Sequence, residues 1–194
     1  MKYQSLLAAS SAIFLTIVPS LGAVIHNESI HGDLSGIFGT PTLLNLTLGE
    51  NTIIAQMGNN GGTGATLAGR DADYFTVTLE PNETLVSITV DAFTFGPNNP
   101  GVSFAGYIAA AAFAGQEEED IGGSAFFNAS SGNILDDFTG GSTPLGQGTY
   151  SFWFQETSNN VVNYQLTFNV IPEPSSALLT AGGILFCLVS RRKK

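Results

Sequence analysis

Apolar and polar residues alternate without exception in one segment near the C-terminus of the chain, residues 162–170. The apolar positions are Val162, Tyr164, Leu166, Phe168 and Val170, and the residues between them are Asn163, Gln165, Thr167 and Asn169. Successive side chains of a β-strand point to opposite faces of the sheet, whereas an amphipathic helix repeats its apolar residues every three or four positions. The alternation therefore predicts a strand with one buried and one solvated face.

The same two-residue period recurs through much of the chain. The further segments that show it are 44–48, 75–79, 86–90 and 150–154, and residues 52–56 are expected to be a short neighbouring strand. Clusters rich in Gly and Asn, which are typical of turns, separate these segments, and residues 109–116 are expected to be a strand end and a loop. Residues 24–171 are therefore predicted to form one all-β domain, an antiparallel β-sandwich of jelly-roll-like type with about eight strands.

The charge of this domain is strongly one-sided. Residues 24–171 contain fifteen acidic residues and a single Lys or Arg, Arg70. Such a surface repels nucleic acid and anionic lipid, and it attracts divalent cations or cationic partners. We therefore expect no nucleic-acid partner. The only cysteine, Cys187, lies in the C-terminal apolar run, so no disulfide stabilises the domain.

The N-terminal 23 residues have the pattern of a secretory signal peptide. Lys2 provides the positive start, residues 6–18 form an apolar core, and Pro19 precedes small residues that end at Ala23. We predict cleavage at Ala23 and export of the remaining chain.

The C-terminal residues combine a proline motif, an apolar run and a basic end. Pro172, Glu173 and Pro174 are followed by residues 175–190, a short candidate transmembrane helix, and then by Arg191, Arg192, Lys193 and Lys194. The basic residues would hold the C-terminus on the cytoplasmic side and leave the acidic domain outside. Two prolines keep the motif extended and remove backbone donors.

These three features, in this order over residues 172–194, resemble the PEP-CTERM sorting signal of Gram-negative bacteria. The resemblance implies an exosortase as partner, a precursor held transiently at the inner membrane, and later transfer to the cell surface or extracellular matrix. It also implies an association with exopolysaccharide. Pro172, Glu173 and Pro174 would then be the recognition and cleavage site of a substrate, and Arg191 to Lys194 would set the membrane topology.

A second resemblance covers about residues 48–170. The segments that carry it read Arg70-Asp71-Ala72-Asp73-Tyr74-Phe75-Thr76-Val77, Pro81-Asn82-Glu83-Thr84-Leu85, Gly148-Thr149-Tyr150 and Tyr164-Gln165-Leu166. They are similar to the bacterial pre-peptidase C-terminal domain, although residues 96–140 are not distinctive. The resemblance implies a small sandwich in an extracellular setting and, because such modules are accessory, no activity.

Carboxylates are the only abundant reactive groups of the domain. Asp71 and Asp73 lie two residues apart at a strand start and should point to the same side. Calcium is bound by oxygen ligands of this kind, so these two residues are candidate calcium ligands; a solvated turn is the alternative. No other cofactor is indicated.

Other chemistry has weaker support. His26 and His31 are the only histidines, and we expect both to be solvated rather than parts of a metal or Ser-His-Asp site. Trp153 falls on the face opposite Phe152 and Phe154, and it is the candidate for an exposed ligand platform.

The sequence therefore favours an exported, non-enzymatic surface or matrix protein with a structural or adhesive role. A calcium-dependent or carbohydrate-binding module is the first alternative. A small hydrolase that uses acidic residues is the second.

Overall fold

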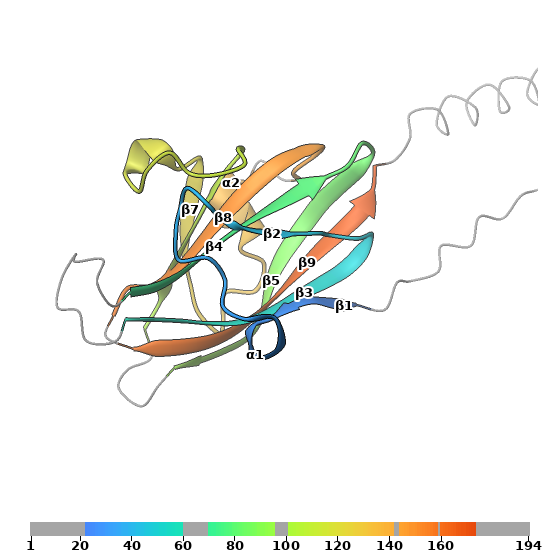
Figure 1. Ribbon diagram of the computed structural model, residues 1–194. Helices are drawn as coiled ribbons and strands as arrows, with labels where there is room; N and C mark the ends of the chain where they lie inside the picture. The colour runs from blue at the N-terminus through green and yellow to red at the C-terminus, as the bar shows by residue number, and fades with distance from the viewer. Residues whose placement is uncertain (1–21, 60–69, 96–100, 142–143, 159, 174–194) are drawn as a thin grey trace, which may run out of the picture.

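The computed structural model describes residues 22–59, 70–95, 101–141, 144–158 and 160–173, and the fold is built mainly from β-strands (Figure 1). The strands are β1 (Ala23–Asn27), β2 (Thr42–Leu44), β3 (Gly49–Asn59), β4 (Arg70–Leu79), β5 (Glu83–Phe95), β6 (Ser103–Ile108), β7 (Gly123–Phe127), β8 (Gly148–Glu156) and β9 (Val161–Pro172). Two short α-helices, α1 (Glu28–His31) and α2 (Leu135–Thr139), and a 3₁₀ turn at Glu118–Asp120 complete the described elements. The prediction of an all-β fold is confirmed.

The nine strands form one curled sheet (Figure 1). Along the sheet the strand order is β5-β9-β3-β4-β8-β6-β7, and each neighbouring pair is antiparallel. β1 and β2 lie off this path and run parallel to β3 and β4 respectively. β3 pairs with β4 only at its end, through Gly58 with Asp71 and Asn59 with Arg70, so the sheet has a corner there.

The core lies inside the curl and is rich in phenylalanine. The apolar residues of β9 that alternate in the sequence are all at most 2 % exposed. Phe168 of β9 contacts the ring of Phe152 on β8 at 5.4 Å between centroids and that of Phe75 on β4 at 5.8 Å. Buried aromatic pairs of this kind contribute both apolar area and ring–ring contact to stability. The inward faces predicted for residues 75–79 and 162–170 are thus correct throughout. In residues 150–154, Phe152 and Phe154 are buried as predicted, and Tyr150 is half-buried.

The prediction for β5 needs a correction. The alternation placed Val86, Ile88 and Val90 on the core face, but Leu85 and Ile88 are the fully buried residues, and Val86 is only half-buried. The cause is a break in register against β9 between Leu85 and Ser87. An extra residue in a strand reverses which side chains face the core.

The strand predicted at residues 44–48 is also wrong in its extent. β2 ends at Leu44, and Leu48 is 44 % exposed. The buried Asn51 side chain accepts a 2.8 Å hydrogen bond from the Thr47 N–H and donates a 2.7 Å bond to the Thr47 carbonyl, which closes a turn instead. The neighbouring strand β3 is longer than predicted.

Residues 101–141 add β6, β7 and α2, which gives nine strands rather than about eight. Within the described ranges no helix has the length and apolar character needed to cross a membrane. Residues 1–21 of the predicted signal peptide, Pro174, the apolar run 175–190 and the basic residues 191–194 lie outside the described residues.

Candidate functional site

An N-terminal arm, residues 22–44, crosses the corner between β3 and β4 (Figure 1). β1 pairs with β3 up to Asn27, which lies opposite Ile54. The arm then turns through α1 and reaches β4, where the Ser35 carbonyl accepts a 2.8 Å hydrogen bond from the N–H of Tyr74. Beyond this contact, β2 of the arm pairs with β4. The arm therefore connects two strands that touch each other only at their ends.

Helix α1 brings Glu28 to this corner. Asn27 caps the helix, because its Oδ1 accepts a 3.0 Å hydrogen bond from the Ser29 N–H. Gly32 ends it with a φ of 87°, a backbone conformation that glycine adopts at little cost. The Glu28 carboxylate then accepts hydrogen bonds from two backbone N–H groups, at 2.7 Å from Gln56 and 3.2 Å from Leu34.

Asp73 approaches the same corner from β4 and is fully buried. The Tyr164 hydroxyl donates a 2.7 Å hydrogen bond to its Oδ2. Its Oδ1 is buried and has no hydrogen-bond partner among the described residues. Most buried polar atoms in folded proteins are paired, so this oxygen requires an explanation.

Glu28, Asp33 and Asp73 meet as an acidic cluster. One carboxylate oxygen from each lies within 4.8 Å of the others. Glu28 is half-buried, Asp33 is exposed and Asp73 is buried, so the cluster runs from the surface into the sheet. Asp71, also half-buried, lies beside it on β4. Three hard oxygen ligands in this arrangement could hold a divalent cation.

The carboxyl groups of the corner are hard to ionise together. Burial raises the pKa of Glu28 to about 7, against the lowering effect of the Gln56 and Leu34 N–H groups. Burial, reinforced by the charge of Asp33, raises the pKa of Asp71 to about 6. Burial raises the pKa of Asp73 well above its usual range, although the Tyr164 hydrogen bond opposes the shift. Protons or a bound cation must therefore compensate the negative charge.

The sequence identified only part of this cluster. Asp73 is a member, and Asp71 is its neighbour, so the two predicted calcium ligands do lie at one place. Glu28 and Asp33 were missed because they come from the arm, and no local pattern links them to β4. The Asn27-Glu28-Ser29 segment carries a capping residue, which signals a helix start but no ligand.

The histidines are only partly as predicted. His31 is exposed, and its Nδ1 accepts a 2.9 Å hydrogen bond from the Asn27 N–H. His26 is 5 % exposed rather than solvated, because it lies in β1 opposite Ile53. Burial and the neighbouring His31 lower the pKa of His26. The two rings lie 5.4 Å apart.

Trp153 is not an exposed platform, and that prediction is wrong. The side chain is 8 % exposed and stacks on Tyr74 at 5.5 Å between ring centroids. The segment 109–122 folds over it and contributes Phe113 to the contact. This covering segment is held by the Ser151 and Thr76 hydroxyls, which donate hydrogen bonds to the carbonyls at positions 110 and 111, at 2.8 and 2.9 Å.

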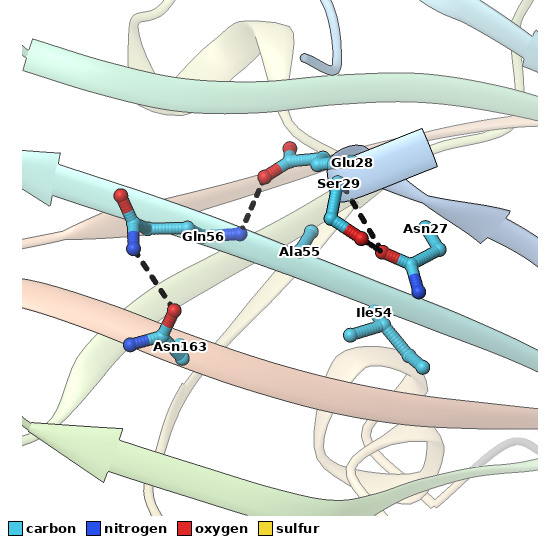
Figure 2. A pocket seen from close by; sticks show the side chains of 7 residues that line it. All are labelled: Asn27, Glu28, Ser29, Ile54, Ala55, Gln56 and Asn163. Atoms are coloured by element: carbon cyan, nitrogen blue, oxygen red, sulfur yellow. Dashed lines mark hydrogen bonds between the residues drawn. The ribbon is translucent and has the colours of Figure 1, made fainter. Parts of the chain in front are cut away.

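A shallow pocket of about 440 Å³ adjoins the acidic cluster through Glu28 (Figure 2). The arm supplies one wall and strands β3 and β9 supply the floor. The lining residues are Asn27, Glu28, Ser29, Ile54, Ala55, Gln56 and Asn163. Within it the Gln56 side-chain N–H donates a 2.9 Å hydrogen bond to Asn163 Oδ1 (Figure 2).

No family model, curated protein or solved structure matches this chain.

Proposed function

We propose that this chain is an exported bacterial protein of the cell surface or extracellular matrix, sorted by an exosortase and without catalytic activity. The observation that carries the proposal is the position of the sheet between the two sorting features. β1 begins at Ala23, the predicted cleavage residue, and β9 ends at Pro172, the first residue of the motif. Removal of both ends would leave the folded domain intact.

The sorting motif begins where the sheet ends. Pro172 and Glu173 are exposed, and the Glu173 N–H donates a 2.7 Å hydrogen bond to the Asn82 carbonyl. A peptidase could reach the chain directly after this last contact.

We further propose that the curled sheet is a jelly-roll-like β-sandwich, in line with the resemblance of residues 48–170 to the pre-peptidase C-terminal domain. The hydrolase alternative has less support, because fully buried Asp73 cannot reach a substrate.

Intact mass of the protein from its native host tests the sorting proposal. We expect a membrane-bound precursor and an extracellular form that starts near Val24 and ends between Pro172 and Pro174. A Glu173→Ala variant should accumulate as precursor, whereas Glu119→Ala, at another exposed acidic residue, should be processed normally. An extracellular form that retains Arg191 to Lys194 would refute sorting by cleavage.

We also propose that the domain binds calcium through Glu28, Asp33 and Asp73. The observation that favours this function is the buried Asp73 Oδ1, which lacks a partner inside a cluster of carboxylates. A buried carboxylate oxygen without a hydrogen bond is costly. A cation at this position would supply the missing interaction and compensate the repulsion between the acidic groups.

Calcium fits the ligand set better than other common cations. All three side chains offer only oxygen, and the set contains neither cysteine nor histidine, which zinc and copper prefer. Two oxygens on one calcium ion, each at about 2.4 Å, can lie up to about 4.8 Å apart, and the cluster satisfies this limit. Magnesium usually keeps several waters and takes only one or two carboxylates.

A cation here would tie the arm to the sheet. Glu28 and Asp33 belong to the arm and Asp73 to β4, so one ion would cross-link segments about 40 residues apart in the sequence. Because the unfolded chain lacks this arrangement, binding would stabilise the folded domain.

Thermal unfolding of the full-length protein in detergent tests the calcium proposal. After removal of metals with EDTA, calcium at about 100 times its Kd should raise the midpoint by about 5–10 °C. Magnesium should have a smaller effect. Asp33→Asn should abolish most of the shift, because it removes one of the three proposed carboxylate ligands. Asp33 is exposed, so its replacement should leave the core unchanged. Asp137→Asn, an exposed acid on α2, is the matched control. A midpoint that calcium leaves unchanged would eliminate the proposed site.

A further inference from the structure

The pocket beside the acidic cluster has free hydrogen-bonding groups of both kinds. Within the described part of the chain, Asn27 Nδ2 and Asn163 Nδ2 donate to no protein group, and Gln56 Oε1 accepts from none. The Ser29 hydroxyl donates to Asn27 Oδ1 at 2.7 Å, which leaves its lone pairs available. The pocket therefore offers donors and acceptors together with the aliphatic side chain of Ile54 (Figure 2).

This chemistry excludes most ligand classes. The lining has no cationic side chain, and Glu28 is acidic, so phosphate and carboxylate ligands would be repelled. It has no aromatic ring and only two aliphatic residues, so a large apolar ligand would bury little area. A cationic ligand could use Glu28 but would leave the two amide N–H₂ groups unpaired. Hydroxyl groups, which both donate and accept, match the whole set.

We infer that this pocket binds a neutral, hydroxyl-rich glycan unit, and that calcium in the adjacent cluster fixes the arm that forms its wall. This inference rests on the calcium proposal above. A pocket of about 440 Å³ lies in the size range of small-molecule sites. The glycan ring would lie on Ile54, and its hydroxyls would bond to the amides of Asn27, Gln56 and Asn163.

Glu28 couples the two sites. One of its carboxylate oxygens accepts the Gln56 N–H at 2.7 Å, and the same side chain belongs to both the acidic cluster and the pocket lining. A cation that holds Glu28 and Asp33 would also hold Asn27 and Ser29 in place, because these residues flank Glu28 in the capped turn. Coupling of this kind is reciprocal, so the glycan should strengthen calcium binding by the same factor.

Saturation-transfer NMR and titration calorimetry on the full-length protein test the inference. The detergent should be non-glycosidic, for example an amine oxide. The neutral probes are cellohexaose, maltohexaose and a dextran oligomer; an alginate oligomer and spermine serve as anionic and cationic probes. In the presence of calcium we expect saturation transfer from the protein to at least one neutral probe. Asn163→Ala should weaken binding of that probe about tenfold or more, because it removes direct hydrogen bonds. Asn169→Ala, on the same strand and outside the pocket, should leave the Kd unchanged.

The outcomes separate this inference from the calcium proposal. If calcium raises the unfolding midpoint but no neutral probe binds, or if alginate or spermine binds more tightly, the glycan inference is overturned and the calcium site stands. Equal binding of a neutral probe in calcium and in EDTA also overturns the inference, because it removes the coupling. Calcium-dependent binding that Asn163→Ala weakens and Asn169→Ala does not would establish it.

Discussion

The Tyr164 hydroxyl donates a 2.7 Å hydrogen bond to Asp73 Oδ2, and both side chains are buried inside the sheet. The bond joins β9 to β4, two strands that are not neighbours in the sheet. It satisfies one carboxylate oxygen and leaves the other without a protein partner. Burial raises the pKa of both groups. Asp73 is thus held in place by the core, and its carboxylate lies in one cluster with those of Glu28 and Asp33 of the arm.

Asp73→Asn should separate the two roles of this residue. The amide can still accept the Tyr164 hydrogen bond, and it removes a buried acid from a repulsive cluster. We expect the unfolding midpoint in EDTA to stay the same or rise, while the calcium-induced shift disappears. Calorimetric melting in EDTA and in calcium measures both values. A lower midpoint in EDTA would mean that the carboxylate itself stabilises the metal-free fold.

The metal-free protein should lose stability as the pH rises. Glu28 and Asp71 have folded-state pKa values of about 7 and about 6, above their usual values, and that of Asp73 is also raised. The folded state therefore binds more protons than the unfolded chain, and the free energy of unfolding decreases as the pH passes through these values. The lowered pKa of His26 acts in the opposite direction, but three acids outnumber it.

Melting curves in EDTA between about pH 5 and pH 8 check this trend. With excess calcium the slope should reverse, because protons compete with the ion for the same oxygens. Asp73→Asn should flatten the profile in EDTA. A metal-free midpoint that rises over this range would contradict the assigned pKa shifts.

Sequence reasoning worked where one strand alone decides the outcome. The alternation in residues 162–170 fixed the buried face of β9 because no bulge interrupts its pairing with β3. The alternation gave the wrong buried face for Leu85 and Val86, because a β-bulge depends on pairing with the partner strand and is not visible in the two-residue period of the sequence. The candidate site followed the same rule. Asp71 and Asp73 share one strand and were predicted as candidate ligands. Glu28 and Asp33 lie in the arm, and the path of the arm across the sheet cannot be derived from the alternation. Trp153 was assigned to the correct face, but the segment that covers it cannot be derived from alternation.

Trp153 should behave as a structural residue. It is the only tryptophan of the chain, so intrinsic fluorescence reports on it directly. We expect acrylamide to quench its emission weakly, because the ring is 8 % exposed. Trp153→Ala should cost about 3–5 kcal/mol of unfolding free energy. Phe126→Ala, at an aromatic residue that is 64 % exposed on β7, should cost much less. Strong quenching in the native protein would show that the covering segment opens.

Asn51 should be a costly polar residue to remove. Its side chain is fully buried and donates hydrogen bonds to the carbonyls of Thr47, Gly49 and Phe168, at 2.7, 3.0 and 3.3 Å. Its Oδ1 accepts the Thr47 N–H at 2.8 Å. Asn51→Ala would remove all of these side-chain hydrogen bonds from the buried turn, at a cost of about 2–3 kcal/mol or more.

Urea unfolding of Asn51→Ala measures this cost, with Asn45→Ala as the control. Asn45 is exposed and lies in the same connection between β2 and β3, so its replacement should change the unfolding free energy by less than about 0.5 kcal/mol. The turn that Asn51 closes also sets where β3 begins, and β3 carries Gln56 and the floor of the pocket. A cost similar to that of Asn45→Ala would mean that water replaces the Asn51 side chain, and that the start of β3 is fixed by its pairing with β9 instead.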